Sequence, residues 1–139
     1  MASPNSERSD REATVRSLFE RLSARDFEGV VELLDNDVEF DLAFAPKVLE
    51  MPVRGRTAMH ELLTNVIGTL FEPFQIELTT TYPCEDGATI VAEYHSDGVV
   101  KHNGRPYINT YVGIFRFGAG GITFWREYHN PEVATAAIS

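Results

Sequence analysis

Two side chains near the end of the chain have the types and the spacing needed to move protons. Glu127 and His129 lie two residues apart in the run 122–129, whose alternation predicts a strand, so they share one face with Trp125. A carboxyl group and an imidazole on one face could act as general acid and base near neutral pH. His129 could instead merely cap the sheet beside the turn at Pro131.

A third candidate lies on the first predicted strand. Apolar residues alternate with polar or small ones from Val38 to Phe44, which indicates a strand with one buried face. Asp41 falls on the opposite, odd-numbered face. It could be a base, or simply a solvated carboxylate near the end of a strand.

Composition excludes several classes of function. The 139 residues include 12 Lys and Arg against 21 Asp and Glu, a formal charge of −9, and they contain no basic patch, so we expect neither nucleic-acid nor membrane-surface binding. The single Cys84 and the absence of zinc-type spacing predict no structural metal, and no glycine pattern for a cofactor is present. With a polar N-terminus that lacks an apolar leader, we expect a soluble, unprocessed, cytoplasmic protein.

The order of elements predicts one domain of the α+β class. We expect flexible tails at 1–8 and 134–139 around a domain at 9–133, with a loop at 45–56 and Pro73 ending the last helix. The predicted helices are 9–24, 26–34 and 57–70, and the later strands are 75–82, 88–100, 106–117 and 122–129. These helices should cover one face of a curled antiparallel sheet.

The Asn103-Gly104 pair predicts the register of the hairpin around it. With these two residues at the centre of the turn, one face of the hairpin carries three facing pairs: Gly98 and Asn109, Ser96 and Tyr111, Tyr94 and Gly113. A bulge at Asp97-Gly98 would instead bring Glu93 and His95 to that face.

Several local motifs, taken with this order, resemble a known superfamily. They are Phe44-Ala45-Pro46, Gly55-Arg56, Gly104-Arg105-Pro106-Tyr107 and the ending Arg126-Glu127-Tyr128-His129-Asn130-Pro131. Over residues 9–133 the chain resembles the cone-shaped NTF2-like fold, and within it the SnoaL-like and ketosteroid-isomerase-like proteins, including the PhzA/PhzB type. This resemblance implies a central, largely apolar pocket and a homodimer.

The resemblance also implies roles for residues. It places Glu127 inside the pocket, where burial should raise the pKa of its carboxyl group toward neutrality, although Arg126, Arg105 or a neighbouring hydroxyl could hold Glu127 for structural reasons. Asp41 matches the proton-abstracting base of the isomerase pattern. In the isomerase pattern two other side chains form an oxyanion hole by donating hydrogen bonds to the substrate. Their positions fall near Leu18 and Gly113, whose side chains cannot donate, so Tyr111 or Asn109 would have to substitute.

The predicted pocket therefore has three candidate catalytic residues, Glu127, Asp41 and His129. Its ligand contacts are predicted to be Tyr111, Asn109, Trp125, Tyr94, Phe44 and Leu18. The expected function is a cofactor-independent isomerase, cyclase or dehydratase that acts on a small hydrophobic, cyclic metabolite. The alternatives are a protein of the same fold that binds such a ligand without turnover, and a structural domain. An apolar outer face on the strand 106–117, formed by Ile108, Thr110, Val112 and Ile114, predicts a homodimer.

Overall fold

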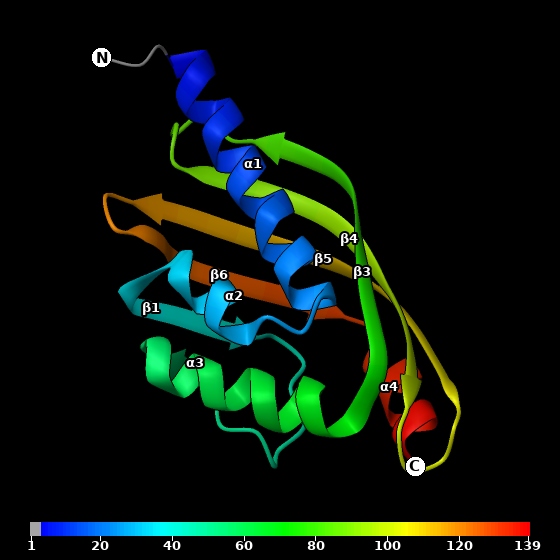
Figure 1. Ribbon diagram of the computed structural model, residues 1–139. Coiled ribbons are helices and arrows are strands. Elements are labelled where there is room, and N and C mark those ends of the chain that lie inside the picture. Colours follow the sequence, from blue (N-terminus) through cyan, green and yellow to red (C-terminus); the bar gives the residue numbers. More distant parts are fainter. Residues whose placement is uncertain (1–3) are drawn as a thin grey trace.

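The computed structural model describes residues 4–139 and contains one sheet and four helices (Figure 1). The sheet has six strands in the order β2-β1-β6-β5-β4-β3. The elements in chain order are α1 (Pro4–Ser23), α2 (Phe27–Glu32), β1 (Leu34–Leu42), β2 (Val53–Arg54), α3 (Arg56–Leu62), a π-helical turn η1 (Leu63–Gly68), β3 (Phe71–Pro83), β4 (Thr89–Val100), β5 (Pro106–Gly118), β6 (Gly121–His129) and α4 (Pro131–Ile138). The predicted α+β class is confirmed.

The strands β3 to β6 form the antiparallel meander expected from their alternating residues and turns. One pairing differs from the expectation of an antiparallel sheet. The strand β1 lies parallel to β6, and in this pairing Leu42 is the partner of Glu127. Between these two strands the chain forms β2, α3, η1 and the strands β3 to β5, and this long connection permits the parallel pairing.

The β4–β5 hairpin keeps the predicted faces but not the predicted partners. The backbone of Val100 pairs with that of Arg105, so the loop is longer than a two-residue Asn-Gly turn. Asn103 accepts a hydrogen bond from the Arg105 amide instead of sitting in a tight turn. The register moves by two residues, which leaves every side chain on its predicted face. The observed pairs are Gly98 with Tyr107, Ser96 with Asn109 and Tyr94 with Tyr111.

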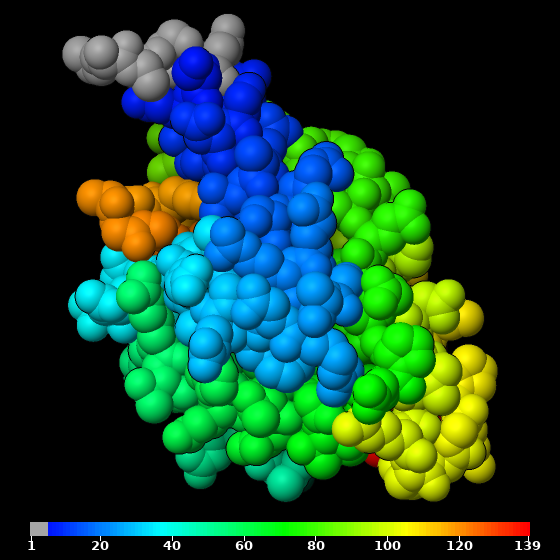
Figure 2. All heavy atoms as spheres, in the orientation of Figure 1, coloured from blue at the N-terminus to red at the C-terminus, as the bar shows by residue number. Residues whose placement is uncertain are grey.

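The helices α1, α2 and α3 lie on one side of the sheet, and α1 and α2 cover the middle of that face of the molecule (Figures 1 and 2). The apolar stripe of α1 packs against aromatic residues of the concave sheet face: Phe19 contacts Tyr94, with ring centroids 4.2 Å apart, and Trp125, at 6.2 Å. None of the helices in residues 4–139 is long and apolar enough to cross a membrane.

Helices occupy most of the two segments that were predicted as tails. Residues 1–3 lie outside the described part of the chain, but α1 already begins at Pro4, a residue that suits the first turn of a helix. Residues 134–139 belong to α4, which the sequence analysis missed. Asn130 caps this helix through a bond from the Glu132 amide, and Pro131 occupies its first turn.

The middle of the chain also differs from the prediction in detail. The loop 45–56 contains the short strand β2, which pairs with β1. The predicted long helix divides into α3 and η1, where the Thr69 hydroxyl donates to the Thr64 carbonyl. Pro73 does not end this helix but lies inside β3, where the register with β4 shifts between Phe71 and Phe74. Such an irregularity lets a strand accommodate a proline.

The outer face of β5 generates the first prediction. Ile108 is 60% exposed, and Val112 and Ile114 lie beside it, an arrangement that favours cover by a second copy of the chain. We expect the protein to sediment as a dimer at micromolar concentration and Ile108→Asp to shift it toward monomer. Val48→Asp, which changes an apolar residue that is 86% exposed on the loop after β1, away from β5, is the control. A monomeric wild-type protein would contradict the prediction.

Candidate active site

A cavity of about 590 Å³ lies between the concave face of the sheet, α3, η1, α4 and the loop after β1. Its size is in the range of small-molecule sites. Most lining residues are apolar, and the polar exceptions are Tyr107, Tyr111, Glu127, His129, Thr135 and Ser139. Within the described residues, no Lys or Arg lines this cavity.

Glu127 is placed in the cavity by the inward face of β6. Its backbone neighbour on β5 is Gly113, and this glycine lets the ring of Tyr94 reach Glu127 from β4. A Cβ atom at Gly113 would lie 2.7 Å from the Tyr94 hydroxyl oxygen and 2.8 Å from the Phe115 ring, closer than such atoms approach. The missing side chain therefore permits contact across three strands.

Two opposing effects set the acidity of Glu127. The Tyr94 hydroxyl donates a hydrogen bond of 2.5 Å to Glu127 Oε1, and this bond lowers the pKa of the carboxyl group. Removal from water is the larger effect and raises its pKa from 4.5 to about 7. Glu127 as a whole is half-buried, and it lines the cavity. At neutral pH both protonation states are populated, as a general acid or base requires.

Trp125 and His129 lie on either side of Glu127 along the same face of β6, as predicted, and both line the cavity. Burial lowers the pKa of His129, so its imidazole is mainly neutral at pH 7, and its buried Nδ1 atom has no hydrogen-bond partner among residues 4–139. Trp125 Nε1 also lacks a hydrogen-bond partner in this part of the chain, although the indole is close enough to Tyr94 to lower the pKa of that phenol. His129 therefore lies beside the site as a polar, uncharged group.

A second group of polar side chains on β4 and β5 forms a buried hydrogen-bonded chain. The Tyr111 hydroxyl lies 2.9 Å from Ser96 Oγ and donates to the Tyr107 hydroxyl, also at 2.9 Å. Asn109 Nδ2 donates to the same Tyr107 oxygen and to the carbonyl of Asn130, at the N-cap of α4. This chain connects the cavity wall to the helix that closes one side of the cavity.

The C-terminal helix α4 is fixed at its other end by the β4–β5 hairpin (Figure 1). Asn103 Nδ2 donates to the Ala137 carbonyl at 2.8 Å, and Arg105 donates to the carbonyls of Ala136 and Ser139, both at 3.0 Å. The Gly104-Arg105-Pro106-Tyr107 motif and the residues after Glu127 thus meet at one edge of the cavity.

The structure places Asp41 away from the cavity. Asp41 lies on the opposite face of β1 from Phe40, which lines the cavity, and its Oδ2 accepts a hydrogen bond of 3.0 Å from Arg126 Nε. The structure therefore corrects the predicted placement of this base, which lies outside the cavity, and it also differs from the solvated carboxylate that was the alternative, because Asp41 is paired with Arg126. Arg126 and Arg105 bond other groups and do not hold Glu127, whereas a neighbouring hydroxyl, that of Tyr94, does.

The predicted ligand contacts divide into two groups. Tyr111, Trp125 and Phe44 line the cavity, and Phe44 is exposed at its rim. Leu18, Asn109 and Tyr94 are buried behind the wall and do not line it, which corrects their predicted contact with a ligand. Leu18 lies on the buried face of α1, in the core. Asn109 donates a hydrogen bond to Tyr107, and Tyr94 donates one to Glu127.

Sequence reasoning missed Tyr107 as a wall residue and α4 as a cover. Tyr107 is two residues from Asn109 on the strand that was already predicted to face inward, so the alternation could have identified it. Asn130-Pro131 followed by Glu132 is a recognisable helix start.

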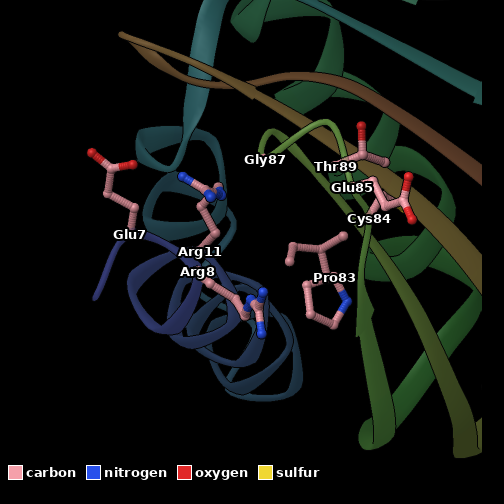
Figure 3. A pocket seen from close by; sticks show the side chains of 9 residues that line it. Glu7, Arg8, Arg11, Pro83, Cys84, Glu85, Gly87 and Thr89 are labelled. Carbon is pink, nitrogen blue, oxygen red and sulfur yellow. The ribbon is translucent and has the colours of Figure 1, made fainter. Parts of the chain in front are cut away.

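A smaller hollow of about 180 Å³ lies between the start of α1 and the β3–β4 turn (Figure 3). Arg8 and Arg11 face Cys84 and Glu85 there. This hollow is smaller than typical ligand sites, it mixes both signs of charge, and it is separate from the cavity that holds Glu127.

Comparison with known proteins agrees with this architecture. The model of the SnoaL-like domain matches residues 15–125. The chain belongs to the SnoaL-like domain family. The match ends two residues before Glu127, so the position of that carboxyl group depends on the geometry described above. The fold is that of the wider NTF2-like superfamily.

Three individual proteins are similar to this SnoaL-like chain. "Uncharacterized protein YesE" of Bacillus subtilis is 28% identical over 130 residues, which cover 90% of this chain and 84% of that protein. The crystal structure of a "Putative Isomerase from Bacillus subtilis" is 26% identical with a TM-score of 0.84, covering 94% of each chain. A "putative polyketide cyclase" from Xanthomonas campestris, at 23% identity and a TM-score of 0.79, covers 96% of this chain and 100% of its own, and shares the fold.

The Tyr94–Glu127 contact generates a prediction about acidity. Tyr94→Phe removes the one hydrogen bond that lowers the pKa of Glu127, so this pKa should rise above its wild-type value. Carboxyl-carbon NMR titration measures it. Tyr82→Phe is a matched control, because the exposed Tyr82 hydroxyl bonds Glu93 on the other face of the sheet. An unchanged pKa in Tyr94→Phe would show that the contact does not act on Glu127.

Burial of Glu127 also predicts a pH dependence of stability. The native state binds this proton more tightly than the unfolded chain, so the free energy of unfolding should fall as pH rises from 4.5 to about 7. Glu127→Gln cannot ionise, and its unfolding free energy relative to wild type should therefore increase by ~3 kcal/mol between about pH 4 and about pH 8. Chemical denaturation at both pH values tests this; a difference that does not change with pH would contradict it.

Proposed function

We propose that the protein is a cofactor-independent enzyme that moves a proton on a small, hydrophobic molecule held in the cavity, with Glu127 as the general acid or base. The observation that carries this proposal is the carboxyl group of Glu127, buried at the wall of an apolar cavity with a pKa of about 7. The same carboxyl group can remove a proton from one atom of a bound molecule and return it to another, as isomerisation, cyclisation and dehydration require.

Three features of the site support this proposal. The cavity wall lacks Lys and Arg within the described residues, so it favours an uncharged molecule over a carboxylate or phosphate. Aromatic and aliphatic side chains supply the area that a ring-shaped molecule would cover. The hydrogen bond from Tyr94 fixes one oxygen of Glu127 and leaves the other for the ligand.

Membership of the SnoaL-like family and the similarity to the "Putative Isomerase from Bacillus subtilis" support a small-molecule enzyme. The second candidate function is binding of the same ligand without turnover. The shifted pKa of Glu127 favours the enzyme, because a carrier has no need of a carboxyl group that titrates near neutrality.

A nitrobenzisoxazole tests the proposed base without knowledge of the natural substrate. When a base removes the ring C–H proton of this uncharged molecule, the N–O bond breaks and a coloured nitrile-phenolate forms. The wild-type rate should rise with pH to a plateau, with a midpoint near 7, because the carboxylate is the active form. Glu127→Gln should lower the rate by about 100-fold or more.

Glu77→Gln is the matched control, because this glutamate lies exposed on β3, where its carboxylate is 3.3 Å from His95 Nε2. Its rate should equal that of the wild type. Turnover that survives in Glu127→Gln, or a rate without a midpoint near neutral pH, would remove Glu127 from the mechanism. Tight binding of the probe without turnover would favour the carrier.

A further inference from the structure

We infer that Tyr107 is the hydrogen-bond donor that positions the ligand, and that the cavity selects an uncharged molecule with an acceptor oxygen such as a ketone carbonyl. This inference deepens the proposed function, on which it rests, by naming the polar group of the ligand. It follows from counting the donors and acceptors of the buried hydroxyl chain.

The hydrogen bonds of Asn109 show how its side-chain amide is oriented and which of its hydrogens are used. Its Oδ1 atom accepts from the backbone amides of Thr110, at 2.8 Å, and Asn130, at 3.3 Å. The other atom must therefore be the amide nitrogen, whose two hydrogens go to the Asn130 carbonyl at 3.0 Å and the Tyr107 hydroxyl oxygen at 2.9 Å. Asn109 has no hydrogen left for a ligand.

The direction of the hydroxyl chain fixes the other end. Tyr111 donates its single hydroxyl hydrogen to Tyr107, and Ser96 must then donate to Tyr111. Tyr111, although it lines the cavity, likewise has no hydrogen to offer. Both residues that the sequence suggested as substitute donors are thus already engaged.

Tyr107 is left with a free hydrogen. A phenol oxygen accepts at most two hydrogen bonds, and both positions are occupied, by Tyr111 and Asn109. Its own hydrogen finds no acceptor among residues 4–139, and Tyr107 lines the cavity. Two incoming donors also polarise the phenol and strengthen it as a donor.

The ring that carries this hydroxyl is held rigidly. Phe71 stacks on Tyr107 with ring centroids 4.7 Å apart, and Phe74 lies at 6.3 Å. A donor that is fixed before the ligand arrives loses little freedom on binding. Because Glu127 lines the same cavity, an oxygen bound by Tyr107 would orient the rest of the molecule relative to the carboxyl group.

Acetophenone and ethylbenzene test the inference as a pair, because they are similar in size and only the ketone has an acceptor oxygen. Tyr107→Phe should weaken the binding of acetophenone by about tenfold and leave that of ethylbenzene unchanged. Tyr111→Phe is the matched control from the same chain: it keeps the free Tyr107 hydrogen, so the preference for the ketone should persist. Calorimetry or ligand-observed NMR measures each affinity.

Infrared spectra of acetophenone bound to the wild-type protein give a test that needs no variant. The carbonyl stretch should move to lower frequency than in a hydrocarbon solvent, and this shift should disappear in Tyr107→Phe. A wild-type protein that does not bind acetophenone, or binds it without the shift, overturns the inference. So does an equal loss of affinity for both ligands in Tyr107→Phe. These results leave the proposed base untouched, because the nitrobenzisoxazole reaction tests Glu127 separately.

Discussion

The site depends on the transfer of one carboxyl group from water into an apolar wall. Desolvation of Glu127 opposes its ionisation, and a single hydrogen bond from Tyr94 favours it. Because the first effect is larger, the carboxyl group titrates near neutral pH instead of remaining an ordinary surface charge. The protein accepts a loss of stability at neutral and higher pH for this arrangement, a pattern typical of functional sites.

The sheet provides the geometry that makes this arrangement possible. Tyr94, Gly113 and Glu127 lie on three neighbouring strands, and the glycine between the two side chains opens the path for their contact. A change to alanine at Gly113 would separate donor and acceptor. The C-terminal helix α4 and the hydroxyl chain below it then close the cavity on the side where β4 and β5 turn.

Much of the fold could be predicted from the sequence, because alternation and turn residues determine faces. Glu127, Trp125 and His129 share a face in any register of β6, and the two-residue error in the β4–β5 register preserved every inward residue. The role of Asp41 could not be predicted in this way. Its ion pair with Arg126 depends on the parallel pairing of β1 with β6, which local pattern does not encode.

The partners of individual hydrogen bonds were beyond the sequence for the same reason. Tyr111 and Asn109 were identified as polar residues of the inward face, but only the three-dimensional positions of Ser96, Tyr107 and Asn130 show that their hydrogens are already used. Leu18 was assigned to the ligand from a resemblance to a family pattern. Leu18 is completely buried because the face of α1 that carries it packs against the sheet. A residue-by-residue correspondence does not reveal this packing.

The central claim is that the Glu127 carboxyl group lies inside an apolar cavity, and its own titration tests this most directly. NMR of the glutamate carboxyl carbons in the wild-type protein, with Glu127→Gln used to assign the signal, measures its pKa. We predict a midpoint near 7, well above the ordinary value of 4.5. A midpoint at the ordinary value would mean that water reaches this carboxyl group freely, and would contradict the account of the site.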